Sequence, residues 1–134
     1  MARIRTHVTL RVFSESFDVS AIEAVLGLAP TSIRVRNALY PRRFEREGSL
    51  WKYSSKDQLD STDPQDHVDW LLGRLSGSEK TFDHLRAAGC AADIVCFLET
   101  GEQGGFTLTS LQMGALCSLG LDLTWDIYPA EVRA

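Results

Sequence analysis

The side chains best suited to chemistry are arginines and aromatic residues that gather between positions 34 and 53. A guanidinium group presents planar, forked donors that match carboxylate and phosphate groups. Surfaces that mix arginine with tryptophan and tyrosine are typical of binding hot spots. We therefore predict a binding surface here, the alternative being a solvated loop with Trp51 packed in the core. The predicted binding residues are Arg34, Arg36, Arg42, Arg43, Arg46, Trp51 and Tyr53.

Nucleophilic catalysis is not indicated by the sequence. The G-x-S-x-G motif of serine hydrolases does not occur. The cysteines Cys90, Cys96 and Cys117 are odd in number and lack C-x-x-C spacing, which argues against a disulfide framework and a thiolate zinc site. We expect buried free thiols and favour a protein that is not an enzyme.

The histidines give little support for a metal site or a general base. His7, His67 and His84 are scattered, and we interpret each as a surface residue. Asp63 and His67 are four residues apart on one predicted helix, which is a spacing that could place two ligands on one face. Asp63 is already explained as a helix N-cap, next to Pro64 at the first helical position. We therefore predict neither a metal nor a cofactor.

Charge is unevenly distributed along the chain. The 134 residues carry a net charge of −4. Residues 1–56 contain ten lysines and arginines against five acidic residues, a net +5, so the remainder nets −9. The overall acidity argues against general nucleic-acid binding, whereas the asymmetry suits an anion-binding patch or subunits that meet positive to negative. A plain solvated surface is the alternative.

Length and hydropathy indicate one domain, residues 1–134, with no membrane association. We recognise no signal peptide and expect a cytoplasmic protein. The hydrophobic periodicity and capping residues predict ten segments. They are a strand Thr6–Ser14, a short helix from Ser20 to Gly27, a strand Ser32–Arg36, a loop Asn37–Ser49, a strand Leu50–Ser55, helices from Asp63 to Gly77 and from Ser78 to Gly89, a strand Ala92–Thr100, a helix from Thr109 or Ser110 to Gly120, and a strand Leu121–Tyr128.

These segments predict an α+β fold in which two βαβ-like units flank a central αα-hairpin. We expect a ferredoxin-like, mainly antiparallel sheet with helices on one face. The uncovered face is then solvent-exposed surface, a dimer interface or a shallow ligand site. Its predicted lining is Thr9, Arg11, Asp122, Thr124 and Asp126, joined by His7, Phe13 and Tyr128.

The order of several segments resembles a bacterial family known only as domain of unknown function 4279. The segments are LGLAPT (Leu26–Thr31), a basic loop, GSLWKYSS, HVDWLLGRL, GGFTLTS and a closing LDLTWDIY. The resemblance runs from about Thr6 to Tyr128. It implies a small bacterial protein without an established activity, and it supplies no catalytic residues.

Two functional hypotheses follow. The first is a non-enzymatic protein-interaction domain of the immunity or adaptor kind, with a protein partner or a second copy of itself. The second is a binder or enzyme for an anionic small molecule, held by the arginine-rich loop or by the open face of the sheet.

Overall fold

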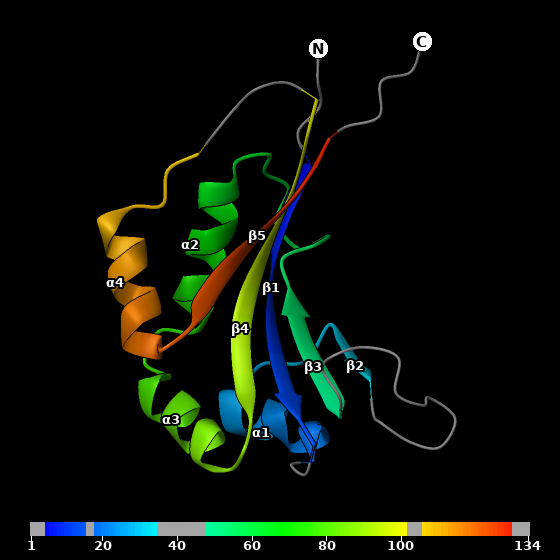
Figure 1. Cartoon of the computed structure of the whole chain (residues 1–134), viewed down its shortest axis with the longest axis vertical. Helices are drawn as coiled ribbons and strands as arrows, with labels where there is room; N and C mark the ends of the chain where they lie inside the picture. Colours follow the sequence, from blue (N-terminus) through cyan, green and yellow to red (C-terminus); the bar gives the residue numbers. More distant parts are fainter. Residues whose placement is uncertain (1–4, 16–17, 35–47, 102–105, 130–134) are drawn as a thin grey trace.

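A single five-stranded sheet organises the part of the chain that the computed structural model describes, residues 5–15, 18–34, 48–101 and 106–129. The sheet order is β2-β3-β1-β4-β5 (Figure 1). The strands are β1 (Arg5–Ser14), β2 (Ser32–Arg34), β3 (Ser49–Ser54), β4 (Ala91–Thr100) and β5 (Asp122–Pro129). The helices are α1 (Ile22–Leu26), which follows the 3-10 turn η1 (Val19–Ala21), then α2 (Pro64–Arg74), α3 (Glu79–Ala87) and α4 (Ser110–Leu119).

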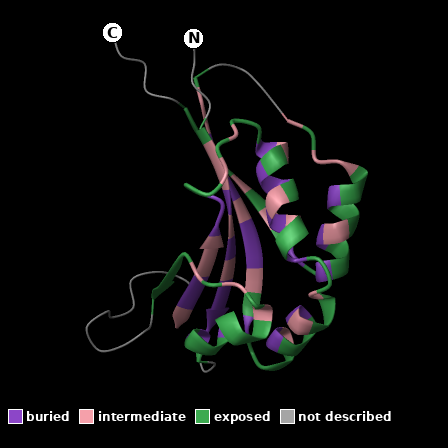
Figure 2. Cartoon of the chain, turned by 180° about the vertical axis from the view of Figure 1, so that it is seen from behind, coloured by how far each residue is buried: buried purple, intermediate pink, exposed green. Residues whose placement is uncertain are grey.

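Strand β1 lies in the middle of the sheet and defines its packed face. Side chains along a strand alternate between the two faces, and Val8, Leu10 and Val12 are all fully buried. The antiparallel register aligns Val12 with Trp51 of β3 and Leu10 with Ile94 of β4, so these side chains share one face. In Figures 1 and 2, helices α2, α3 and α4 lie on one side of the strands.

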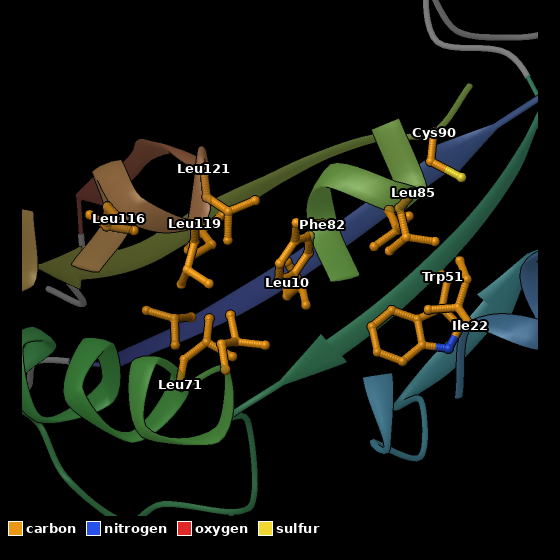
Figure 3. Packing of buried hydrophobic residues seen from close by; sticks show 14 of the residues in the cluster. Leu10, Ile22, Trp51, Leu71, Phe82, Leu85, Cys90, Leu116, Leu119 and Leu121 are labelled. Carbon is orange, nitrogen blue, oxygen red and sulfur yellow. The ribbon is translucent and has the colours of Figure 1, made fainter. Parts of the chain in front are cut away.

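The hydrophobic core fills the space between this face and the helices. Figure 3 shows Leu10 of β1 meeting side chains from the helices in one cluster. The helical members are Ile22, Val68, Leu71, Phe82, Leu85, Leu116 and Leu119. Burying one such leucine or phenylalanine contributes about 1.5–3 kcal/mol, so this cluster is the main source of stability.

The predicted α+β class with a mainly antiparallel sheet is confirmed. Strands β4 and β5 are parallel neighbours connected through α4, which makes a βαβ unit. In the first half, β3 lies between β1 and β2 and pairs antiparallel with both. The ferredoxin-like arrangement is not confirmed, because the two halves differ in this way and β1 pairs antiparallel with β4.

Capping residues explain where α2 and α4 begin and where α1 and α4 end. Asp63 accepts a hydrogen bond from the Gln65 amide and Pro64 is the first residue of α2, as predicted. Gly27 and Gly120 end α1 and α4 in the left-handed conformation, with φ of 73° and 68°.

Ser20 and Glu23 have the residue types and spacing of a capping box, but they do not form one. Asp18 instead accepts from the Ser20 amide and caps η1, and α1 begins after Ala21 without a side-chain cap. Asp18 can reach that amide because an aspartate side chain bonds readily to the backbone two residues ahead.

Helix α4 is attached to α2 by one buried amide side chain. Gln112 Oε1 accepts from the Thr109 amide at 2.9 Å, and Thr109 Oγ1 accepts from the Gln112 amide at 3.1 Å, which completes a capping box. Gln112 Nε2 also donates to Asp69 Oδ1 at 2.8 Å and to the Gln65 carbonyl at 3.2 Å. The neighbouring Leu111 is 85% exposed because Gln112 occupies the inward position.

The substitution Gln112→Ala removes the side-chain bond of the capping box, from the Thr109 amide to Gln112 Oε1, and both bonds to α2. We expect it to lower the free energy of unfolding by about 2 kcal/mol. Met113→Ala, at an exposed position on the same helix, is the matched control and should change it by less than about 0.5 kcal/mol. Urea unfolding measures both, and equal effects would contradict the role given to Gln112.

Candidate functional site

The face of the sheet opposite the core, called the open face below, carries the charged residues of the strands. The register aligns Arg11 with Lys52 on one side and with Asp93 and then Asp122 on the other. Strands β2, β3 and β1 contribute only basic charges, and β4 and β5 contribute only acidic ones. The basic residues are Arg34, Lys52, Arg11 and Arg5, and the acidic residues are Asp93, Glu99, Asp122 and Asp126. The boundary between the two signs therefore runs between β1 and β4.

Two ion pairs bridge this boundary. Arg11 Nε donates to Asp93 Oδ1 at 2.8 Å and Arg11 Nη2 donates to Asp93 Oδ2 at 2.7 Å, a bidentate pair in which Asp93 is 9% exposed. The Arg11 guanidinium also lies 5.1 Å from the centre of the Phe13 ring. Arg5 and Glu99 approach to 3.9 Å near the rim and are more exposed. The short bidentate pair therefore fixes the side chains at the centre of the open face more firmly than the longer, exposed pair fixes those at its edge.

Aromatic rings line the open face next to these charges. His7 stacks on Phe97 with ring centroids 4.8 Å apart, and Phe97 contacts Tyr128 at 5.5 Å. Tyr128 is 48% exposed. Phe13 and Leu50, also on this side of the sheet, are buried. Partly exposed aromatic rings beside ordered charges are the composition that binding surfaces favour.

The structure separates the binding residues predicted from the sequence. Trp51 and Tyr53 point to the packed face, whereas Arg34 lies on the open face, because neighbouring positions of paired strands alternate. Trp51 is fully buried, and Tyr53 stacks on Trp70 of α2 at 5.4 Å. The three described members of the predicted set therefore do not form one surface. The remaining predicted residues, Arg36, Arg42, Arg43 and Arg46, lie outside the described residues.

Trp51 is a structural residue with one unusual feature. Its indole Nε1 is buried and has no hydrogen-bond partner, and this holds for no other buried side-chain nitrogen or oxygen atom among the described residues. Such an atom costs about 1–3 kcal/mol. The large apolar ring offsets this cost within the core, so the alternative that Trp51 packs is the one observed.

A serine and a histidine that no sequence motif connects are hydrogen bonded in the interior. Ser55 Oγ lies 2.6 Å from His67 Nδ1, and His67 Nε2 lies 2.7 Å from the Ser61 carbonyl oxygen. A carbonyl only accepts, so Nε2 carries a hydrogen. In the neutral ring with this tautomer, the Ser55 hydroxyl donates to Nδ1 while accepting from the Val8 amide at 2.9 Å. The prediction that His67 is a surface residue is wrong, since it is 1% exposed.

This pair has the connectivity of a nucleophile and its base, but its setting is structural. Ser55 is 0% exposed, and the third group is a backbone carbonyl in place of a carboxylate. The bonds connect the end of β3, the segment before α2, and β1. Ser55 also donates its amide to the Val8 carbonyl at 3.0 Å, which continues the β1–β3 ladder beyond the last strand residue.

A polar cavity of about 500 Å³ opens where β1 begins and β4 ends. Its lining includes the basic residues Arg5, His7 and Lys56 and the acidic residues Asp57 and Asp60. Burial, followed by the positive charge of Lys56, lowers the pKa of His7. Asp57 has a left-handed φ of 64°, which aspartate tolerates in a tight turn.

The thiols differ in their access to solvent. Burial raises the pKa of Cys96 to about 11 and also raises the pKa of Cys90. Cys117 on α4 is exposed, so the prediction of three buried thiols is wrong for this residue. It lies on the outer side of α4, away from the Leu116 position that packs inward. Among the described residues, no group of three or more possible ligands could hold a metal ion.

Removing the imidazole of His67 should destabilise the fold strongly. We expect His67→Ala to lower the free energy of unfolding by about 2–4 kcal/mol, because it leaves a cavity and unpaired groups at Ser55 and Ser61. His84→Ala, at an exposed position on α3, is the control and should have almost no effect. Comparable urea midpoints for the two variants would refute the structural role of His67.

Thiol modification of the native protein should stop at one group per chain. Cys117 is exposed, whereas Cys90 and Cys96 are buried and disfavour the reactive thiolate. Intact-mass spectrometry after brief iodoacetamide treatment at pH 8 should show one adduct, lost in Cys117→Ser. Rapid addition of two or three adducts to folded protein would contradict the burial described here.

Comparison with known proteins gives a family and no activity. No curated protein matches the chain significantly, and no solved structure does so. Within the described residues, no helix is long and apolar enough to cross a membrane. The family described as Domain of unknown function (DUF4279) matches residues 4–130, nearly the whole chain. The chain therefore belongs to the DUF4279 family, as its segment order suggested.

Proposed function

We propose that this chain is a non-enzymatic protein-interaction domain, of the adaptor or immunity kind, whose binding surface is the open face of the sheet. The observation that carries the proposal is the separation of charge across the β1–β4 boundary beside partly exposed aromatic rings. Such a surface is electrostatically specific, since a partner must present the reverse pattern in the same orientation. The Ser55–His67 pair supports a non-enzymatic interpretation because its hydroxyl is fully buried.

The composition of the face favours a protein over a small molecule. A sheet face is broad and shallow, whereas small-molecule sites are concave and enclose most of their ligand. Arg11 and Asp93 are already oriented by their bidentate bond, so little conformational freedom is lost when a partner covers them. Free thiols in the core agree with a reducing compartment such as the bacterial cytoplasm.

Charge reversal on the open face should weaken partner binding. We expect Lys52→Glu to reduce capture of the protein partner by the tagged chain from its source cells on the order of tenfold or more. Lys80→Glu, an equal charge change at an exposed position of α3, should leave capture unchanged. Mass spectrometry of the captured material gives the readout.

Two outcomes of that experiment would count against the proposal. If Lys52→Glu and Lys80→Glu lose the partner equally, the loss is caused by the change in net charge and not by the open face. If Lys52→Glu captures the partner as well as wild type, the open face takes no part in the interaction. A separate variant that reverses Arg42, Arg43 and Arg46 together reports on the arginine-rich segment predicted from the sequence.

The polar cavity favours a second candidate function, the binding of a small anion. Arg5 and Lys56 supply positive charge there, and protonation of His7 adds a third. Because the pKa of His7 lies below 6.5, its charge appears only as the pH falls below that value. An anion in the cavity should therefore bind more tightly at pH 5 than at pH 8.

This candidate is tested by thermal unfolding with sulfate and with methanesulfonate, which keep their full negative charge at both pH values. A bound anion raises the melting temperature according to RT ln(1 + [L]/Kd). We expect a larger rise at pH 5 that is reduced in Lys56→Gln. Identical melting temperatures with and without both anions would eliminate the cavity as a site for such ligands.

A further inference from the structure

From the charge pattern we infer that the partner of the open face is a second copy of this chain, packed face to face about a two-fold axis parallel to the strands. This inference rests on the proposed function, because it names the partner of the same surface. It depends on the sheet order, the register and the signs of the charges, and it needs no residue outside the described ranges.

The symmetry follows from the position of the charge boundary. A two-fold axis that lies in the interface along the β1–β4 boundary exchanges the two sides of the sheet and keeps the level along the strands. It places β5 of the second copy over β3, and β4 of the second copy over β1. Acidic strands then face basic strands across the whole interface. An axis perpendicular to the strands would instead place like charges over one another.

Specific residues meet in this arrangement because they share one level of the ladder. Lys52, Arg11, Asp93 and Asp122 are aligned across the sheet. Lys52 therefore lies opposite Asp122 of the second copy, and Asp122 lies opposite its Lys52. The two Arg11–Asp93 pairs stack with reversed direction at the centre. Among the described residues, the side chains of Lys52 and Asp122 take part in no ion pair within the chain.

The neutral residues of the face are also self-complementary. One level along from the charges, Thr9 is aligned with Val95 and Thr124. The two-fold axis places Thr9 over Val95 of the second copy, which brings small side chains together at the centre. Phe97 likewise lies opposite His7 of the second copy, so aromatic rings meet in the next layer.

The size of the face is sufficient for a dimer. Strands β3, β1, β4 and β5 are 6, 10, 10 and 8 residues long. At about 4.8 Å between strands and ~3.3 Å per residue, they present a face of about 20 by 28 Å. A standard interface buries about 800 Å² per partner, so face-to-face contact reaches that order. Aligned sheet packing of this kind crosses strands at about −30°.

Sedimentation equilibrium of wild-type and variant chains tests the inference. Lys52→Glu and Asp122→Lys each put two like-charge contacts into the dimer, so each should raise its dissociation constant on the order of 10- to 100-fold. In a mixed dimer, the glutamate introduced at position 52 faces the lysine introduced at position 122, and the native Asp122 faces the native Lys52. The mixture should therefore dimerise with an affinity close to wild type, and Lys80→Glu should dimerise normally.

Several results would overturn the inference. The first is a wild-type chain that is monomeric up to about 0.5 mM. The second is a single variant, Lys52→Glu or Asp122→Lys, that dimerises as well as wild type. The third is a mixture of the two variants that stays monomeric although circular dichroism shows both to be folded. A monomeric wild type that still captures a different protein through Lys52 would refute the second copy and retain the interaction domain. A dimer that dissociates on Lys52→Glu, with the untagged copy lost from the material captured by the tagged chain, supports both.

Discussion

The alternation of side chains along β1 is the constraint on which the rest of this structure depends. Val8, Leu10 and Val12 are fully buried beneath the helices, and the residues between them are left on the opposite face. The register aligns each residue of a central strand with residues on its neighbours that point to the same face. The alternation in β1 therefore decides which residues of β3, β4 and β5 face the core and which face the open side. A slip of one residue would bury Arg11 and expose Leu10, which makes the register strongly specified.

One-sided packing also explains why the charges collect where they do. Burying an unpaired charge costs several kcal/mol, so the strands keep lysine, arginine, aspartate and glutamate away from the core. This cost requires charges on the open face but does not require the two signs to be separated. The separation between β1 and β4 is therefore a feature that folding alone does not explain, and the proposed interaction gives it a role.

Local sequence signals predicted the elements well because local physics fixes them. Asp63 with Pro64, Thr109 with its capping box, and Gly27 and Gly120 mark helix ends through bonds that reach at most a few residues. The alternation in β5 likewise assigned Leu123 and Trp125 to one side of the sheet. The β1–β3–β2 order was not predictable in this way, since it depends on which strands meet after a long connection.

The candidate site was predicted only in part, for two physical reasons. Lys52 lies between Trp51 and Tyr53, and successive residues of a strand face opposite sides of the sheet. This alternation was the available sequence signal that the two aromatic rings would lie on one face of the sheet and that charged side chains such as Arg34 would lie on the other. No comparable signal connects Ser55 with His67, because their contact forms only when the segment between β3 and α2 folds back on itself. Polar residues with a plausible local role, such as a surface histidine, are the ones that tertiary packing most readily reassigns.

Nuclear magnetic resonance tests most directly whether the open face is a contact surface. Amide spectra of the labelled protein would be compared at about 20 μM and 1 mM, which lie below and above the dissociation constant of an ordinary weak dimer. We expect concentration-dependent shifts at Thr9, Val95 and Thr124, with α3 and the outer side of α4 unchanged. Shifts confined to the helices, or spectra that do not change while the protein binds no other partner, would contradict a contact role for this face.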